Sequence, residues 1–88
     1  MTDVVMYMTS WCGFCARARR LLREKGAQVT ELDIDRDPAL RAEMMQKSGR
    51  RTVPQIWIGE EHIGGCDDLY ALERSGQLDE KLQGGSQS

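Results

Sequence analysis

Two cysteines separated by two residues, Cys12 and Cys15, are the side chains of this sequence best suited to chemistry. They follow a short apolar run and open a stretch of helical periodicity, which places Cys12 at the first turn of a helix. Free backbone N–H groups and the positive end of the helix dipole stabilise a thiolate there, and the thiolate is the reactive form. Cys15 lies one turn further on, where it can attack a mixed disulfide on Cys12 and release the bound partner. The motif therefore predicts a redox site with Cys12 as nucleophile and Cys15 as resolving cysteine.

Two other interpretations of these cysteines stay open. Both could be inert core residues, although Gly13 and a strand-to-helix turn, which normally lies at the surface, argue against this. Cys12 and Cys15 could instead join His62 and Cys66 in a zinc site, because these ligand types suit zinc. The two halves of that set lie far apart in the sequence, and His62 falls within a strand pattern.

A second segment that can take part in chemistry is Thr52-Val53-Pro54, directly before a predicted strand. Proline cannot donate to a sheet, so it belongs at the start of a strand or at an edge. An ordinary trans proline satisfies this position, and so does a cis Val53–Pro54 bond, which would turn the Val53 backbone outward. In the cis case the backbone of Val53 can pair with an extended, cysteine-containing tripeptide and hold its sulfur in front of Cys12.

A third segment, residues 64–68, closes one predicted strand and opens a helix with the sequence Gly-Gly-Cys-Asp-Asp. Paired glycines allow close backbone approach, and the free N–H groups of a helix start can bind a carboxylate. Asp67 and Asp68 can either cap the helix or bind an ammonium group. The segment therefore offers both halves of a site for an α-amino-acid group such as a γ-glutamyl end.

Periodicity along the chain indicates the elements that must position these segments. Short apolar or alternating runs predict strands over residues 4–8, 29–34, 55–58 and 61–64, with a turn at 59–60. Helical spacing, capping residues and stop glycines predict helices over residues 12–25 and 37–48, from Asp67 or Asp68 to near Gly76, and over 78–82. The first two strands should form a right-handed parallel unit and the last two a hairpin. This β-α-β-α-β-β-α order is that of the thioredoxin fold, an α/β fold with one mixed four-stranded sheet flanked by helices.

Length and composition limit the remaining possibilities. The 88 residues, 40% hydrophobic and 30% charged, suffice for one domain, which we place at residues 1–82, with a disordered tail over 83–88. A net charge of −2 does not favour nucleic acid or an anionic membrane as a partner. No targeting signal or membrane span is visible near Met1, so we expect a cytoplasmic location. Thiols are kept reduced there, and three cysteines then indicate chemistry or metal rather than cross-links.

Three motifs of the chain together resemble those of the glutaredoxins. In order, and at the separations of that family, they are Cys12-Gly13-Phe14-Cys15, Thr52-Val53-Pro54 and Gly64-Gly65-Cys66-Asp67-Asp68. The chain from residue 4 to about residue 82 is similar to the short bacterial dithiol glutaredoxins. The resemblance implies an enzyme that reduces protein–glutathione mixed disulfides and small disulfides. Its co-substrate would be glutathione, and no hydride cofactor is expected.

The resemblance also implies which residues contact glutathione. Backbone groups of Thr52 and Val53 would hold the cysteinyl part, beside Pro54 in the cis form. The start of the third helix would receive the γ-glutamyl carboxylate, with the amino group near one of the two aspartates. The other residues implied as contacts are Phe14, Gly65, Cys66, Asp67 and Asp68.

Two positions bear on the positive charge that the site offers to the carboxylates of glutathione. Arg41 falls where the family places a polar or basic residue facing the glycine carboxylate, although it could equally be an exposed charge of its helix. The lysine that the family often has shortly before the first cysteine is replaced by Thr9. Arg41, Arg50 or Arg51 could compensate for that lost charge.

The residues between the cysteines suggest an alternative function. Gly13-Phe14 stands where the commonest dithiol form has Pro-Tyr. In related glutaredoxins a small residue there accompanies a [2Fe–2S] cluster bound between two subunits through external glutathione, which would make Cys12 the metal ligand. Trp11 beside Cys12 adds to this hypothesis of an iron–sulfur carrier. The enzyme itself is expected to be a monomer without metal, and the dimer to form around a cluster.

Overall fold

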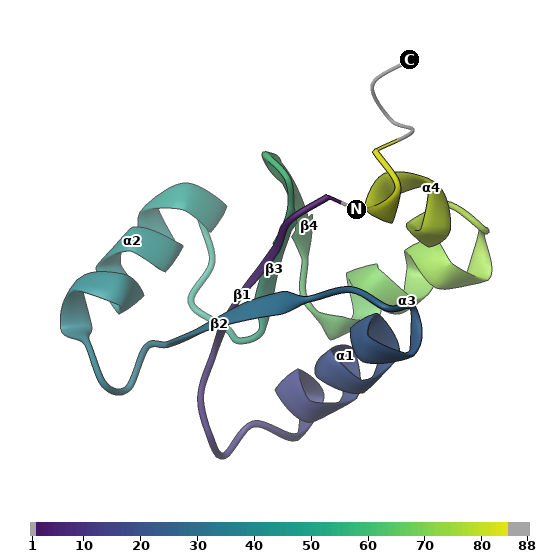
Figure 1. Cartoon of the computed structure of the whole chain (residues 1–88). Helices are drawn as coiled ribbons and strands as arrows, with labels where there is room; N and C mark the ends of the chain where they lie inside the picture. Colours follow the sequence, from purple (N-terminus) through teal and green to yellow (C-terminus); the bar gives the residue numbers. More distant parts are fainter. Residues whose placement is uncertain (1, 85–88) are drawn as a thin grey trace.

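A computed structural model describes residues 2–84 and contains four strands and four helices in that range (Figure 1). In chain order the elements are β1 (Val4–Met8), α1 (Gly13–Glu24), β2 (Val29–Asp33), α2 (Pro38–Ser48), β3 (Gln55–Ile58), β4 (Glu61–Gly64), α3 (Cys66–Arg74) and α4 (Leu78–Leu82). The predicted order of elements is confirmed; β1, β3, β4 and α4 have the predicted bounds, and the ends of the other elements differ by at most two residues.

The four strands form one mixed sheet in the order β2-β1-β3-β4. β1 pairs in parallel with β2 and antiparallel with β3, and β3 and β4 form the predicted hairpin. Met6 in the middle of β1 lies opposite Glu31 of β2 and Ile56 of β3. This topology confirms the thioredoxin fold, in which β1 leads from the interior of the sheet into the Cys12 motif.

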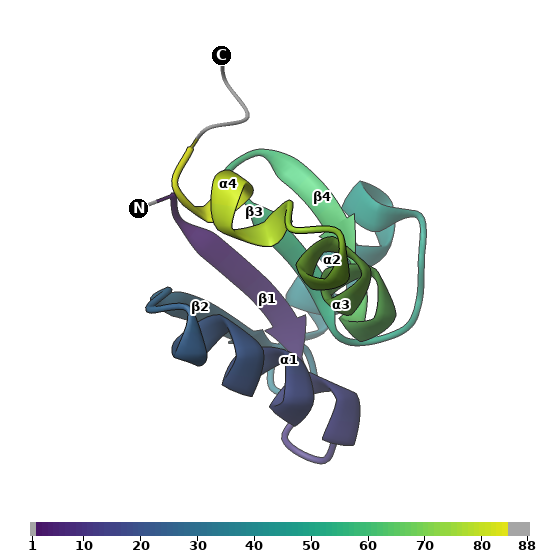
Figure 2. The ribbon, with the colours of Figure 1, turned by 90° about the vertical axis from the view of Figure 1, so that its right-hand side faces the viewer.

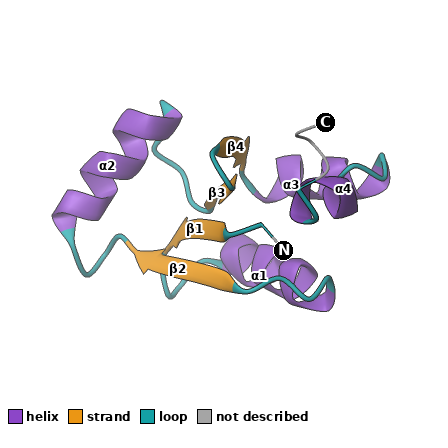
Figure 3. Cartoon of the chain, turned by 45° about the horizontal axis from the view of Figure 1, so that its top comes forward, coloured by secondary structure: helices purple, strands orange, loops and turns teal. Residues whose placement is uncertain are grey.

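Helices cover both faces of the sheet, as Figure 3 shows: α2 lies on one side and α1, α3 and α4 lie on the other. The alternation of β1 explains the two layers, because successive side chains of a strand point to opposite faces. Val4, Met6 and Met8 belong to the larger core cluster, under α1, α3 and α4. Tyr7 belongs to a smaller cluster with Met44 of α2.

The helix ends follow their capping residues. Asp37 caps α2, its carboxylate accepting from the Ala39 N–H at 2.9 Å, and Gly49 ends that helix with φ 72°. The prediction that Asp67 or Asp68 occupies the cap of α3 is wrong, because Gly65 is the cap residue in extended conformation. Asp68 lies within the first turn and reaches back to accept from the Gly65 N–H at 2.9 Å.

The two ends of the described chain lie side by side, next to α4 and the first residue of β1 (Figure 2). The Thr2 N–H donates to the Leu82 carbonyl at 2.8 Å. Gln83 and Gly84 continue α4 as a turn, and the rest of the predicted tail, residues 85–88, lies outside the described residues. Within residues 2–84 no helix combines the length and the apolar character needed to cross a membrane.

Candidate active site

Cys12 lies at the N-terminal cap of α1, directly after the loop that follows β1. Its backbone is extended (φ −94°, ψ 111°), so its side chain turns back over the first turn of the helix. The Sγ atom accepts a hydrogen bond from the Cys15 N–H at 3.0 Å. It also lies 3.7 Å from the Val53 carbonyl oxygen, which accepts from the thiol. Cys12 is thus half-buried, placed at a helix N-terminus and in contact with the Thr52–Pro54 segment.

Cys15 has a different environment, although it is only one helical turn away. Its side chain is fully buried, with 0% of its surface exposed. Burial and the hydrogen bond with Cys12 together raise the pKa of the Cys15 thiol to about 12. Cys66 is also buried, and burial raises the pKa of its thiol as well. All three cysteines are free thiols, and Cys12 is the most accessible of them.

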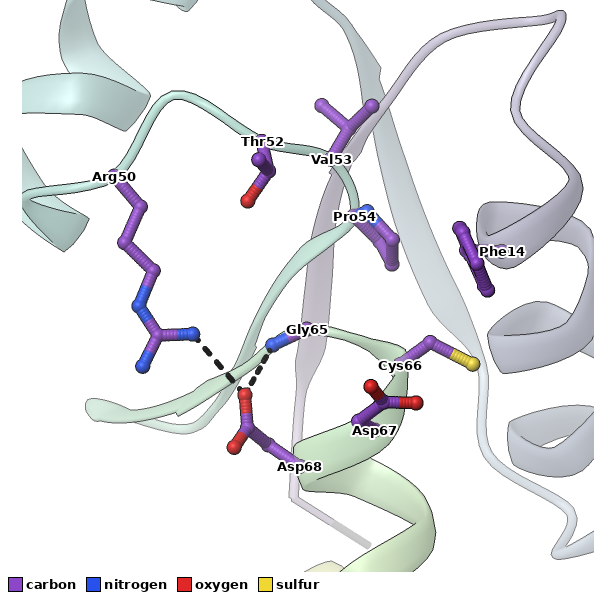
Figure 4. Close-up of a pocket in the computed structure, with 9 residues that line it drawn as sticks. All are labelled: Phe14, Arg50, Thr52, Val53, Pro54, Gly65, Cys66, Asp67 and Asp68. Atoms are coloured by element: carbon purple, nitrogen blue, oxygen red, sulfur yellow. Dashed lines mark hydrogen bonds and ion pairs between the residues drawn. The ribbon is translucent and has the colours of Figure 1, made fainter.

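A pocket of about 300 Å³ opens beside Cys12 between α1, the loop before β3 and the start of α3 (Figure 4). Eight of the residues that the sequence indicates as glutathione contacts meet there, although they come from three distant segments. The pocket is lined by Phe14, Thr52, Val53, Pro54, Gly65, Cys66, Asp67 and Asp68, together with Arg50.

The loop before β3 forms one wall of this pocket. Its Val53–Pro54 peptide bond is cis, which is the form that the glutaredoxin resemblance implies and that strand periodicity alone leaves undecided. The carbonyl of Val53 faces the Sγ of Cys12. In Figure 4 the Pro54 ring lies between Val53 and Phe14.

A buried glutamine holds this loop in place. Gln55 is 0% exposed, and its Nε2 donates to the carbonyl and to the hydroxyl of Thr52 at 3.0 and 3.3 Å. Because the Thr52 carbonyl can only accept, the Oε1 of Gln55 must face the other way, toward His62. His62 Nε2 lies 2.8 Å from that oxygen and therefore carries the proton. Sequence reasoning missed this role of Gln55, which shows no periodicity signal apart from a polar residue at a buried strand position.

The start of α3 forms the opposite wall. Asp68 Oδ2 accepts from the Gly65 N–H at 2.9 Å and pairs with the Arg50 guanidinium at 3.1 Å, as the dashed lines of Figure 4 show. These two contacts hold the pKa of the Asp68 carboxyl below its usual value. Gly64 makes the turn possible: its φ is 115°, and a Cβ on it would lie 2.2 Å from Asp68 Oδ2. Asp67 makes none of these contacts, so its carboxylate remains available to a ligand.

Arg41 is the predicted glutathione contact that lies outside this pocket. It is exposed on α2, where its guanidinium pairs with Asp35 at 3.3 Å. Arg50, which the sequence suggested as a replacement for the missing lysine, is the arginine that lines the pocket. The role of Arg41 as a contact for the glycine carboxylate stays a prediction.

The zinc alternative finds no supporting geometry. Among residues 2–84 no three His, Cys, Asp or Glu side chains gather as they would around a metal ion. His62 is engaged with Gln55 and packs against the Trp57 ring, with 4.5 Å between the ring centroids.

A Cys-x-x-Cys motif at the start of the first helix, facing a cis-proline loop in a thioredoxin fold, defines a thiol–disulfide oxidoreductase. Comparison with known proteins narrows this class. The family model for glutaredoxins matches residues 4–63. A glutaredoxin of Pseudomonas aeruginosa is 57% identical over 93% of this chain and 98% of its own length. Glutaredoxin 3 of Escherichia coli is 52% identical over 94% of this chain and 100% of its own length.

Solved structures agree with these relatives. The structure of a buckwheat glutaredoxin–glutathione complex superposes with a TM-score of 0.86 at 34% identity, covering 93% of this chain and 77% of that one. The chain belongs to the glutaredoxin family. It is accordingly a glutathione-dependent disulfide oxidoreductase.

Proposed function

We propose that this protein reduces protein–glutathione mixed disulfides and small disulfides, with Cys12 as the attacking thiolate and Cys15 as the resolving thiol. The observation that carries the proposal is the contrast between the two cysteines. Cys12 is half-buried at a helix N-terminus beside the pocket, whereas Cys15 is fully buried behind it with a pKa of about 12. A nucleophile must be reached by its substrate, and a resolving thiol needs to reach only the first cysteine.

In the monothiol route, the Cys12 thiolate attacks the glutathione sulfur of a mixed disulfide. A bond forms between Cys12 and glutathione, the original S–S bond breaks, and the protein thiolate leaves and takes up a proton. The thiolate of a second glutathione then attacks the first glutathione's sulfur, which releases oxidised glutathione and returns the Cys12 thiolate. One glutathione thiol is oxidised for each protein–glutathione disulfide that is reduced, because the other half of the oxidised glutathione comes from that disulfide.

In the dithiol route, Cys12 attacks a disulfide and Cys15 displaces the bound partner. The Cys12–Cys15 disulfide that forms is then reduced by two glutathiones. The backbone N–H of Cys15 already lies 3.0 Å from the Cys12 sulfur, so the two residues are placed for this closure.

We propose that glutathione occupies the pocket of Figure 4 in a defined orientation. The Val53 backbone would pair with its cysteinyl residue, which brings the sulfur to Cys12. The N–H groups at the start of α3 would hold the γ-glutamyl carboxylate, with Asp67 beside the amino group. Arg50 lies nearer than Arg41 to the pocket and would hold the glycine carboxylate.

The test is glutathione-dependent reduction of a small mixed disulfide, coupled to glutathione reductase and followed by NADPH oxidation. Cys12→Ser should abolish turnover, because both routes begin at that sulfur. Cys15→Ser should keep deglutathionylation and lose the dithiol route. Substantial turnover in Cys12→Ser would refute the assignment of the nucleophile.

A second candidate function is transport of a [2Fe–2S] cluster, bound between two chains with external glutathione. The supporting observation is the open space at Gly13, where an added Cβ would meet no heavy atom within 4 Å. Cys15 and Cys66 are buried, so Cys12 is the thiol that this chain offers to such a cluster. Anaerobic reconstitution with iron, sulfide and glutathione should then give visible absorption and a dimer. A colourless monomer after reconstitution would exclude this function.

The need for glutathione as reductant also indicates the compartment in which the protein works. Glutathione must remain reduced for either route to turn over, so we propose that the protein works in the cytoplasm. We propose a monomer for catalysis, because the pocket and both cysteines belong to one chain.

A further inference from the structure

The outer surface of α1 carries a second hollow that catalysis does not use. It has a volume of about 490 Å³ and is lined by Ala16, Arg19, Arg20, Arg23 and Glu24, a set that we call the arginine flank. α1 holds four arginines and one glutamate, whereas the whole chain has a net charge of −2. Positive charge is therefore concentrated on the helix that begins at the nucleophile.

The arginine flank and the glutathione pocket lie on different sides of α1. Arg19 and Arg23 approach Glu31 of β2, at 2.6 and 3.8 Å. Arg17 instead lies over the Tyr70 ring of α3, 5.0 Å from its centroid, on the side where Phe14 borders the pocket. Bound glutathione would therefore leave the flank uncovered.

The charges of the flank are only partly neutralised from within the chain. Glu31 is shared by Arg19 and Arg23. Arg20 is exposed, and among residues 2–84 no carboxylate oxygen lies within 4.0 Å of its guanidinium. An anionic partner would thus find an unpaired guanidinium at Arg20, with a second that is weakly paired at Arg23.

The path from Cys12 to these arginines is open. Gly13 and Ala16 are exposed and present no bulky side chain. A helix rises 1.5 Å per residue, so Arg20 and Arg23 lie about 12 and 16 Å along α1 from Cys12. An extended segment covers that distance in about four or five residues. Trp11 is 93% exposed beside Cys12 and is not part of the glutathione pocket, so it adds an apolar contact at the start of this path.

We propose that the arginine flank is a docking surface for protein substrates whose disulfide cysteine is followed or preceded, about four or five positions away, by acidic residues. The proposal rests on the proposed function and specifies its substrates. A carboxylate-bearing peptide fits better than nucleic acid, because the positive charge covers one helix flank of an otherwise acidic chain.

The test compares two glutathionylated peptides of equal length that differ at these positions, one with two glutamates and one with two glutamines. We expect kcat/KM of the wild-type protein to be about 3- to 10-fold higher for the acidic peptide at low salt, as two exposed charge pairs would give. Arg20→Gln/Arg23→Gln should reduce that ratio toward one. Arg36→Gln/Arg74→Gln removes the same charge from exposed positions outside α1 and should keep the ratio. About 0.5 M salt should also abolish the preference.

A kcat/KM ratio near one for the wild-type protein would overturn the docking proposal. It would do so even if the arginine flank proved to be a contact between two copies of the chain. A preference that persists in Arg20→Gln/Arg23→Gln would overturn it too. Turnover of a small mixed disulfide by the wild-type protein is measured in parallel. If that is absent, the proposed function itself fails; if it is present and the peptide ratio is one, only the docking surface fails.

Discussion

The reactivity of each thiol depends on its environment. Cys12 and Cys15 are only one helical turn apart, yet they differ in exposure, hydrogen bonding and pKa. Cys12 combines partial exposure with a hydrogen bond from the helix N-terminus. Cys15 combines full burial with a pKa of about 12. Cys66 lines the pocket wall yet is only 5% exposed. Reactivity should follow these differences rather than the mere number of cysteines.

Alkylation of the reduced protein should therefore be selective. At neutral pH iodoacetamide should label Cys12 well before Cys15 or Cys66, since burial both blocks the latter two and raises their pKa. Mass spectrometry of peptides from timed samples measures this order. The Cys12→Ser protein should show no fast-labelling site, and equal labelling of all three cysteines in native protein would contradict the assignment.

Gln55 should act as a positioning residue for the pocket. Gln55→Leu removes the donors to Thr52 and the acceptor for His62, at roughly 1 kcal/mol for each hydrogen bond lost. We expect a KM for glutathione raised about 5-fold, together with lower stability. Steady-state kinetics with glutathione as the varied substrate measures the shift.

The matched control for this change is Gln46→Leu, the same substitution at an exposed position of α2. It should leave KM unchanged. A purely structural role of Gln55 would lower the melting temperature of Gln55→Leu without a specific rise in KM, and that result would refute the positioning role.

At the scale of elements, the junction between β4 and α3 depends on two adjacent glycines with different requirements. Gly64 has φ 115° and no room for a Cβ, because Asp68 Oδ2 would lie 2.2 Å away. Gly65 has φ −94°, and its nearest such contact is the Pro54 carbonyl oxygen at 3.5 Å. The turn therefore needs glycine at the first position for conformation and tolerates a side chain at the second.

The pair Gly64→Ala and Gly65→Ala tests this difference. Gly64→Ala should lower the free energy of unfolding by roughly 1–3 kcal/mol, through backbone strain and displacement of Asp68 from its hydrogen bond with Gly65. Gly65→Ala should cost less than about 1 kcal/mol. Urea denaturation of both variants measures the two losses, and equal losses would show that the strain at Gly64 has been misjudged.

For the whole molecule, the two layers are linked by a buried phenol. Tyr7 of β1 is 2% exposed and donates a hydrogen bond to Glu43 of α2. Burial and this contact with a carboxylate raise the pKa of Tyr7 from 10.0 to about 12. The unfolded chain therefore releases the Tyr7 proton first as the pH rises, which favours unfolding above pH 10.

We expect this group to contribute about 2–3 kcal/mol of stability at neutral pH that is lost between pH 10 and about 12. Cys15, whose pKa is also raised, acts in the same direction, so the comparison must isolate Tyr7. Urea denaturation of wild type and Tyr7→Phe across this range does so. As the pH rises, the free energy of unfolding of the wild type should fall more steeply than that of Tyr7→Phe. Parallel curves of this free energy against pH would contradict the raised pKa of Tyr7.

Much of the fold could be predicted because local signals agree with tertiary packing. The apolar run at residues 4–8 and the capping pair Asp37-Pro38 each specify one element, and the structure has them there. The thiol pair was predictable for a similar reason, since its spacing and its strand-to-helix context are local. The cap of α3 was mispredicted because extended Gly65 leaves Asp68 free to reach back from inside the helix.

The rest of the site depends on contacts between distant segments. Arg50 enters the pocket through its pairing with Asp68, which lies 18 residues further along the chain. Gln55 is oriented toward Thr52 by its hydrogen bond with His62 on the neighbouring strand. The periodicity of the sequence gives no signal for such pairings between distant segments. The cis form of the Val53–Pro54 bond follows from the family resemblance, because the strand pattern is the same for either isomer.

The hydrogen bond between Thr2 and Leu82 brings the two ends of the described chain together, and this has a practical consequence for building biosensors. Both residues lie at the end of β1 where the strand begins, about 13 Å from the end that leads to Cys12. A fluorescent reporter fused beyond either residue would be attached at the end of the sheet opposite Cys12, where it would not block substrates from reaching that thiol. The same proximity of the two ends suits circular permutation, in which a short linker joins them and new termini are opened in a surface loop.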